Sequence, residues 1–385
     1  MLMASSKLFF QLSMICFLFL FSRNEMCSGV QLPDISALES CNIDRIYNLG
    51  DSTSDVGNRV VEDPVNTCLQ PPYGQSFYQG PTGRCSDGML IIDYTALAAG
   101  LPLIDPYLQG NSNFTHGVNF AVGGATALSI EALAEKNIIP FGTSSSLDVQ
   151  LEWLSTHLAS KCSTDIHCCP GCLKNALFMM GLIGSNDYNF ALSMGQSSED
   201  AKKLVPDIVE VIKDAVRRII SLGASQIVIP GSFPMGCFPT SQVTFKSNNK
   251  SDYDEHHCLK DIDDVLAFHN QHLQQAIITL QEENPTATIL YADYYSAYMW
   301  LLDNAPQLGF DATSVLEGCC GNGGMSGSVF PTKVCGNPIP ACSDPNQYIS
   351  WDGIHMTQKA HSFLTNWLVA DMIPKLNCAL QVEDH

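Results

Sequence analysis

The chain is 385 residues long and carries 39 acidic and 19 basic side chains, so its formal net charge is −20 at pH 7. A surface of this sign repels nucleic acid and anionic lipid, which argues against partners of either kind and favours neutral or cationic ones. The length fits one large domain with long functional loops, because no low-complexity linker and no internal repeat divides the sequence.

The first 28 residues have the pattern of a secretory signal peptide. Lys7 precedes a largely apolar run over residues 8–21, and small and polar residues follow around Ser28. This run is too short to cross a bilayer as a stable helix, and no later segment comes near the roughly 20 apolar residues that a span needs. We expect cleavage after residues 1–28, a single domain over 29–385 and no stable membrane insertion; an uncleaved anchor is the alternative.

Five short apolar runs recur along the chain, with helix-length segments between them. They cover residues 43–49, 118–121, 176–183, 226–230 and 287–292. Strands that are buried on both faces and separated by helices are typical of a parallel sheet with helices on both sides. Residues 202–222 have the apolar spacing of an amphipathic helix that packs on such a sheet. We therefore predict an α/β fold.

The first apolar run ends in Gly50-Asp51-Ser52, where polar turn residues begin. An Asp-Ser pair after a strand is often only turn material or a helix cap. Here the serine also stands where a helix can start and where the site of an open parallel sheet gathers, beyond the carboxyl ends of the strands. We predict that Ser52 is a nucleophile, and that Asp51 and Asp55 fix the turn.

The second and third runs also end in polar motifs. Gly123-Gly124 follows the second run, and Asn186 follows the third within Gly184-Ser185-Asn186-Asp187. A glycine N–H is open to close approach because no side chain covers it, and an asparagine amide can donate to a tetrahedral oxyanion. We predict an oxyanion hole from the Ser52 backbone, Asn186, and either Gly124 or Gly123. An ordinary turn asparagine is the alternative for Asn186.

Sixteen cysteines are present, and two of them, Cys16 and Cys27, lie within the leader. The fourteen that remain (16 − 2) are an even number, which predicts disulfides in an oxidising compartment. The secretory route makes disulfides the better interpretation, so we expect no metal. A zinc site is the alternative, by spacing alone, for one dense group made up of Cys162, His167, Cys168, Cys169 and Cys172.

Two Asn-x-Ser/Thr sequons begin at Asn113 and Asn249. They predict glycosylated surface loops in a chain that enters the secretory pathway. Together with the leader, they indicate an extracellular protein of the apoplast or a protein of the vacuole.

Near the C-terminus, Trp351-Asp352-Gly353-Ile354-His355 supplies an acid and an imidazole three residues apart. A lone histidine is more often structural. A carboxylate at this spacing, however, can reach the ring nitrogen that faces away from a serine, orient the ring and stabilise the imidazolium. We therefore predict that Ser52, His355 and Asp352 are the nucleophile, base and orienting acid of a hydrolytic site.

Four blocks, in this order, resemble the plant GDSL esterase/lipases of the SGNH hydrolase superfamily. The likeness extends over essentially the whole mature chain, although Ser185 stands where relatives often have glycine or glutamate. A segment with Cys319-Cys320-Gly321, Cys335-Gly336 and Cys342 is also similar to the cysteine-rich segment of that family. The four blocks are Gly50-Asp51-Ser52, residues 119–125, Gly184-Ser185-Asn186-Asp187 and Asp352-Gly353-Ile354-His355.

The resemblance implies Ser52 as nucleophile, with Asp352 and His355 completing the triad and Gly124 and Asn186 joining the Ser52 backbone in the oxyanion hole. It also implies a three-layer α/β/α, flavodoxin-like fold with a mainly parallel central sheet and no metal or organic cofactor. The cysteine pattern and the opening over residues 41–50 look most like the branch that contains acetylajmalan esterase and sinapine esterase. That likeness implies specialised-metabolite esters, such as an alkaloid acetate or a phenolic ester, as substrates.

We therefore expect a secreted serine carboxylic-ester hydrolase that acts on a small-molecule ester through an acyl-enzyme. An acyltransferase with the same residues is the first alternative, because exclusion of water from the pocket decides between the two. A non-catalytic glycan- or wall-binding protein that kept the fold is the second.

Overall fold

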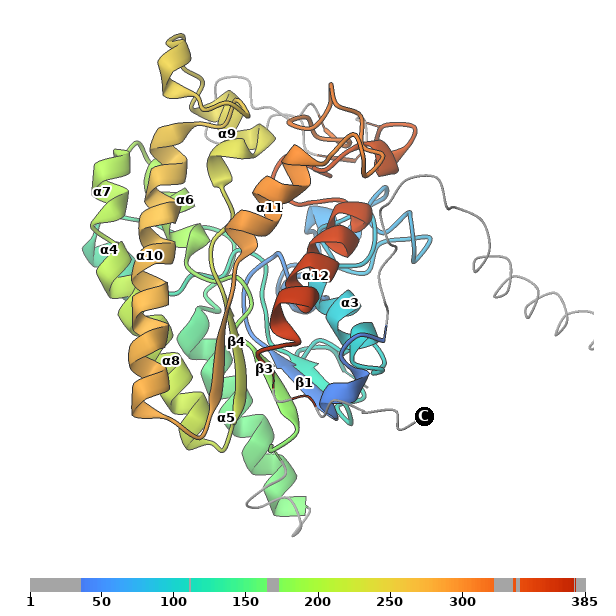
Figure 1. Ribbon diagram of the computed structural model, residues 1–385, viewed down its shortest axis with the longest axis vertical. Helices are drawn as coiled ribbons and strands as arrows, with labels where there is room; N and C mark the ends of the chain where they lie inside the picture. The colour runs from blue at the N-terminus through green and yellow to red at the C-terminus, as the bar shows by residue number, and fades with distance from the viewer. Residues whose placement is uncertain are drawn as a thin grey trace, which may run out of the picture. The chain divides into compact units, whose positions relative to one another are not determined.

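The computed structural model describes residues 36–110, 112–164, 173–321, 335–336, 340–376 and 378, with the backbone alone for 162–164 (Figure 1). The chain divides into Met1–Leu32, which lies outside these ranges, and a compact unit over Pro33–His385. The predicted signal peptide and the side chains of the dense cysteine group at 162–172 also lie outside the described residues. In the ranges described, no helix combines the length and apolar character that a membrane span requires.

Five parallel strands form the central sheet, in the order β2-β1-β3-β4-β5. All four residues of β3 and three of the four in β1 are buried, as expected of strands covered on both faces. The predicted parallel sheet is therefore confirmed. The strands are β1 (Arg45–Asn48), β2 (Gly117–Asn119), β3 (Ala176–Met179), β4 (Gln226–Pro230) and β5 (Thr288–Ala292).

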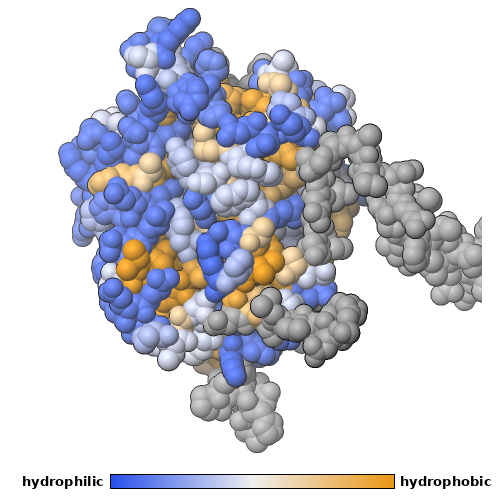
Figure 2. All heavy atoms as spheres, in the orientation of Figure 1, coloured by the Kyte–Doolittle hydropathy of each residue, from blue (hydrophilic) through white to orange (hydrophobic). Residues whose placement is uncertain are grey.

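Helices cover both faces of the sheet, which gives three layers (Figure 1). One layer contains α5 (Leu147–Thr164), α8 (Val205–Ser221) and α10 (Lys260–Glu283); the other contains α3 (Ile91–Ala98), α11 (Tyr294–Asp303) and α12 (Gln358–Met372). The face drawn in Figure 2 is mostly hydrophilic, with hydrophobic residues in smaller patches. The shorter helices are α2 (Asn58–Glu62), α4 (Ile130–Glu135), α6 (Ser185–Ser193), α7 (Ser198–Lys202) and α9 (Pro239–Thr244), with 3-10 turns η1 (Glu39–Cys41), η2 (Thr67–Leu69), η3 (Met235–Cys237), η4 (Lys250–Asp252) and η5 (Pro345–Gln347).

Two predicted elements differ from the observed ones by three residues or more at one end. The apolar run over 176–183 is a strand only as far as Met179, because the chain turns at Gly181 with a φ of 52°. A Cβ at Gly181 would lie 1.8 Å from the carbonyl oxygen of Leu49, so only glycine allows this approach. The helix expected over 202–222 starts at Val205, with Pro206 in its first turn, where a missing N–H costs nothing.

Disulfides join all ten cysteines whose side chains fall within the described residues. This agrees with the disulfide interpretation of the cysteine count. One bridge ties the two ends of the described chain together across 337 residues of sequence, and four close short loops. The pairs are Cys41–Cys378, Cys68–Cys85, Cys237–Cys258, Cys319–Cys342 and Cys320–Cys335.

Candidate active site

The loop after β1 presents Ser52 beyond the carboxyl end of the sheet. The chain leaves the strand at Gly50, whose φ is 139° and whose N–H and C=O both bond the buried amide of Gln150 at 2.9 Å. Asp51 then accepts the backbone N–H of Thr53 at 2.9 Å and its hydroxyl at 2.8 Å. These bonds fix a tight turn and leave the Ser52 side chain at its top.

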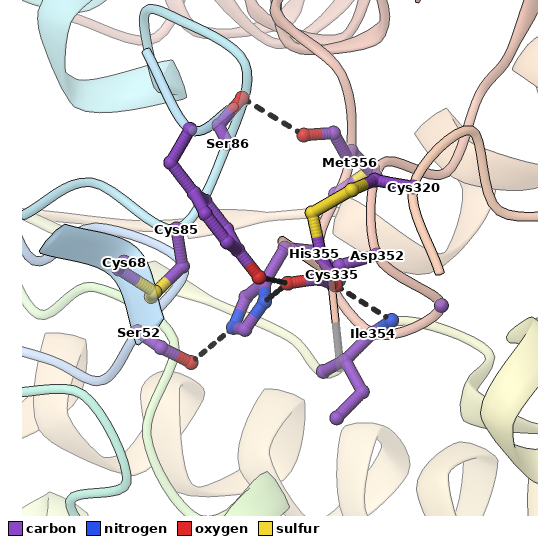
Figure 3. Close-up of polar contacts among 12 residues, drawn as sticks. Ser52, Cys68, Cys85, Ser86, Cys320, Cys335, Asp352, Ile354, His355 and Met356 are labelled. Carbon is purple, nitrogen blue, oxygen red and sulfur yellow. Dashed lines mark hydrogen bonds and ion pairs between the residues drawn. A yellow bond between two sulfur atoms is a disulfide. The ribbon is translucent and has the colours of Figure 1, made fainter. Parts of the chain in front are cut away.

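His355 lies between Ser52 and Asp352, although 303 residues separate the serine from the histidine (Figure 3). The Nε2 atom of His355 is 2.8 Å from Ser52 Oγ, and its Nδ1 atom is 2.8 Å from Asp352 Oδ2. Because an ionised carboxylate only accepts hydrogen bonds, this network assigns the ring proton to Nδ1 and leaves Nε2 to accept from the serine hydroxyl. The structure thus brings together the three residues that the sequence singled out.

Asp352 is held by a set of donors that keeps it ionised. Its Oδ1 accepts the backbone N–H groups of Ile354 at 3.0 Å and His355 at 2.8 Å, and its Oδ2 also accepts the hydroxyl of Tyr73 at 2.9 Å. Burial alone would raise the pKa of Asp352, but the charge of His355 and the hydrogen bonds from His355 and the Ile354 N–H outweigh burial and lower it. Sequence reasoning missed Tyr73, because no local pattern links residues 279 positions apart.

The pKa of His355 moves in the opposite direction. Burial disfavours its charged form, but the charge and hydrogen bond of Asp352, with a smaller effect from Asp51, raise the pKa above the ordinary value of 6.5. A raised pKa makes the ring a better proton acceptor and stabilises the imidazolium that forms when a serine proton is withdrawn.

Two backbone N–H groups near Ser52 have no acceptor among the described residues. These are the N–H of Ser52 itself and the N–H of Gly124, where φ is 85°. The N–H of Gly123, in contrast, donates to Asp55 Oδ2 at 2.8 Å. The geometry therefore favours Gly124 over Gly123, a choice that the sequence left open.

Asn186, at the start of α6, supplies a third donor on the same side. One N–H of its amide donates to the carbonyl of Ala125 at 2.9 Å, which orients the group, and the amide carries a second N–H. The cleft in which these groups meet has a volume of about 300 Å³. It is lined by Ser52, Gly124, Asn186 and His355 among others, so the predicted site residues share one cavity.

Two buried polar residues connect the loops that carry these donors. Asp187 accepts the backbone N–H groups of Ala127 at 2.9 Å and Leu128 at 3.0 Å, and burial raises the pKa of Asp187 to about 7. Asn58 donates to two backbone carbonyls at the end of β2, at 2.8 and 2.9 Å. Asp187 stands inside a motif that the sequence highlighted, but neither residue was given this bridging role.

The remaining site predictions concern metals and glycans. Within the described part of the chain, Cys237, Cys258 and Asp263 lie close enough together to hold a metal, but the two sulfurs form a disulfide and are not available as thiolates. The dense group considered for zinc lies outside the described residues. Asn113 and Asn249 are both exposed, as glycosylation at these positions would require.

The chain is similar to known proteins over most of its length. Residues 46–368 match the GDSL-like Lipase/Acylhydrolase family. Acetylajmalan esterase 1 of Rauvolfia serpentina is 43% identical over 349 residues, covering 90% of this chain and 90% of the relative. A GDSL esterase/lipase of Arabidopsis thaliana is 38% identical, covering 89% of this chain and 86% of its own length. Since strand-end loops and an Asp-x-x-His segment converge on one serine in a chain so similar to named esterases, the protein belongs to the GDSL lipase/acylhydrolase family and is a carboxylic-ester hydrolase.

Proposed function

We propose that Ser52, His355 and Asp352 are the catalytic residues and that hydrolysis passes through an acyl-enzyme on Ser52. The observation that carries this proposal is the unbroken pair of 2.8 Å contacts from Ser52 Oγ through the imidazole to the carboxylate. Nearby N–H groups without acceptors support a role in binding the oxyanion.

In this mechanism His355 Nε2 takes the proton of Ser52 as Oγ attacks the ester carbonyl carbon. The carbonyl oxygen becomes an oxyanion and accepts hydrogen bonds from Ser52 N–H, Gly124 N–H and the Asn186 amide. When the tetrahedral intermediate collapses, the C–O bond to the alcohol breaks and His355 returns the proton to the leaving oxygen. A water molecule, deprotonated by the same imidazole, then attacks the acyl carbon. The bond from this carbon to Oγ breaks, His355 returns the proton to Oγ, and the carboxylic acid and free Ser52 are released.

The test is Ser52→Ala in the purified, glycosylated chain with p-nitrophenyl acetate as substrate. Among the described residues the Ser52 hydroxyl bonds His355 alone, so the variant should keep its melting temperature and lose at least about 10³-fold in kcat. The matched control is Ser221→Ala, which changes an exposed serine at the end of α8 whose hydroxyl donates to the Arg218 carbonyl. Diethyl p-nitrophenyl phosphate should label Ser52 in the native chain, as seen by peptide mass. Full turnover by Ser52→Ala would refute the mechanism.

We infer further that the substrate is a specialised-metabolite ester, such as an alkaloid acetate or a phenolic ester. The name and 43% identity of acetylajmalan esterase 1 support an acetate, and the net charge of −20 favours a cationic alcohol part. Competition between a cationic alkaloid acetate and a neutral acetate of equal size tests the charge preference. Equal kcat/KM values for the cationic and the neutral acetate, at both low and high ionic strength, would contradict the charge preference.

We also propose that the protein is secreted or delivered to the vacuole. The predicted signal peptide, the two exposed sequons and the five disulfides support an oxidising, glycosylating route. A chain expressed in plant cells should lose mass with an endoglycosidase, and Asn113→Gln with Asn249→Gln should abolish that change. A cytosolic, unglycosylated product would contradict the proposal.

A further inference from the structure

A second, smaller cavity opens beside Ser52. Its volume is about 60 Å³, against about 300 Å³ for the cleft described above. Ser52 and Asn186 line both, but His355 and Gly124 line only the larger cleft. The wall of the smaller cavity contains a group of apolar side chains, namely Leu182, Phe233, Met235, Phe238 and Ile354.

The position of His355 decides which half of an ester each cavity can take. The leaving oxygen has to receive its proton from His355 Nε2, so the alcohol part has to lie on the side that His355 lines. The carbonyl oxygen has to face the donors of Gly124 and Asn186. The carbonyl oxygen and the leaving oxygen therefore both face the larger cleft. The substituent on the acyl carbon is left with the smaller cavity, which Ser52 lines and His355 does not.

We propose that this smaller cavity is the acyl pocket and that it restricts the enzyme to short, saturated acyl groups. A cavity of about 150 Å³ holds benzene, which corresponds to about 25 Å³ for each carbon atom. A volume of about 60 Å³ therefore holds about two carbons beyond the carbonyl. The larger cleft then holds the bulkier alcohol part. This assignment rests on the proposed role of Ser52 and adds the size of the acyl group that Ser52 accepts.

The walls of the smaller cavity are braced against widening. Phe233 is buried and packs on Tyr294 at 4.8 Å and Tyr298 at 5.9 Å, and the ring of Phe238 lies 5.6 Å from Tyr298. The turn between the two phenylalanines, η3, is held by the Cys237–Cys258 disulfide. A longer acyl chain would have to displace this packed aromatic group, which is costly in a close-packed interior.

The larger cleft has a different character. It carries Phe141, an exposed phenylalanine that stacks edge-on against Phe190 at 4.5 Å, together with polar groups such as Asn66 and Thr67. An exposed aromatic ring beside polar side chains suits a ring-containing alcohol with a few hydrogen-bonding groups. Phe141 therefore offers a matched control, since it lies in the cavity assigned to the alcohol.

The test compares p-nitrophenyl esters of acetate, butyrate, hexanoate and octanoate, which share one alcohol. We expect kcat/KM of the wild-type chain to fall by at least about tenfold between acetate and hexanoate. Phe238→Ala removes the half-buried ring from the acyl side and should raise the hexanoate-to-acetate ratio by at least about tenfold. Phe238→Leu retains most of the packing and should give a smaller shift in the same direction.

Phe141→Ala should leave the hexanoate-to-acetate ratio unchanged and instead raise KM for 1-naphthyl acetate relative to p-nitrophenyl acetate. A ratio that responds to Phe141→Ala and not to either Phe238 variant would overturn the assignment, and so would a wild-type preference for octanoate. These outcomes leave the role of Ser52 intact as long as Ser52→Ala stays inactive. Activity of Ser52→Ala on acetate would instead remove the proposed function, whatever the chain-length preference.

Discussion

The two sides of the proposed active site are built in different ways. Ser52, Gly124 and Asn186 follow three neighbouring parallel strands, β1, β2 and β3, so the sheet itself sets their spacing. Buried side chains, Asp187 and Asn58, then tie these loops to one another through backbone groups. These three residues, the proposed nucleophile and oxyanion donors, form what we call the sheet side of the site, and the most regular part of the fold positions them.

Asp352 and His355, which we call the base side of the site, lie instead on a segment outside the sheet. The turn that carries them is closed by a bond of 2.7 Å from the N–H of Trp351 to the carbonyl of His355. Around Trp351 a separate buried cluster gathers the disulfide cysteines Cys68, Cys85, Cys319, Cys320 and Cys335 with Tyr73. The base side therefore depends on cross-links and a few side-chain bonds, so it should be the side that is easier to disturb without unfolding the sheet.

Asp352→Asn should produce the largest effect, because it disables the base side while the sheet side remains whole. The amide oxygen can still accept the two backbone N–H groups that Oδ1 accepts now, but an amide NH₂ cannot accept the proton of His355 Nδ1. We expect kcat to fall by about 10³- to 10⁴-fold with little change in melting temperature.

Asp344→Asn is a suitable control for that measurement, since Asp344 is on the same part of the chain and, among the described residues, accepts local groups of η5 alone. A loss of less than about tenfold in Asp352→Asn would mean that the carboxylate does not orient the base.

Asn186→Ala tests the sheet side. Loss of one oxyanion donor typically raises the barrier by about 3 kcal/mol, so kcat should fall by about 10²- to 10³-fold with KM nearly unchanged. The lost bond to Ala125 should cost only about 1 kcal/mol of folding stability. Asn189→Ala, three residues on and in the same cleft, should alter kcat by less than about threefold. Equal effects in both variants would argue against a donor role for Asn186.

The sequence was most informative about the sheet, for a physical reason. A strand buried on both faces needs an unbroken apolar run, and the runs at 226–230 and 287–292 lie on β4 and β5 to within one residue. The third run, 176–183, extends four residues past the end of β3, because an apolar run indicates burial and not strand hydrogen bonding. Residues 180–183 are buried, yet the turn at Gly181 ends the strand before them.

At the site, the sequence identified groups carried by local motifs and missed those defined by distant contacts. Ser52 and the Asp352–His355 pair each stand in a short pattern with a chemical meaning. The choice between Gly123 and Gly124 depends on where the side chain of Asp55 points, 68 residues away, and spacing does not determine that. Long-range contacts of this kind follow from the folded backbone and leave no periodic signal.

Removing the Cys320–Cys335 bridge tests whether the base side depends on its cross-links. In Cys320→Ser with Cys335→Ser, opening a loop of 15 residues should lower the free energy of unfolding by about 3 kcal/mol. Because Cys335 lines the cleft beside His355, kcat should also fall, by about tenfold.

The matched control for this pair is Cys41→Ser with Cys378→Ser, which opens a bridge absent from the cleft lining. We expect that variant to lose stability and, below its melting temperature, to keep its kcat. Equal kcat values in the two double variants would show that the cross-links serve the fold as a whole and not the base side.

Tyr73→Phe should give the smallest and most specific change. For the wild-type chain, activity requires the neutral imidazole, so kcat/KM should fall as the pH drops through the raised pKa of His355, above the ordinary 6.5. Removing the Tyr73 hydroxyl takes one donor from Asp352 Oδ2 and leaves more negative charge for the imidazolium, so the acid limb should move to higher pH.

The ring of Tyr73 packs edge-on against Trp351 at 5.9 Å, and phenylalanine keeps that contact, so the maximal kcat/KM should change by less than about tenfold. Tyr78→Phe removes a buried hydroxyl that has no hydrogen-bond partner within the described ranges and should leave the acid limb in place. Profiles of kcat/KM against pH for the three proteins measure this directly. A shift of the limb to lower pH in Tyr73→Phe would mean that the Tyr73 hydroxyl raises the pKa of His355. The hydroxyl would then strengthen the Asp352–His355 pair and not weaken it.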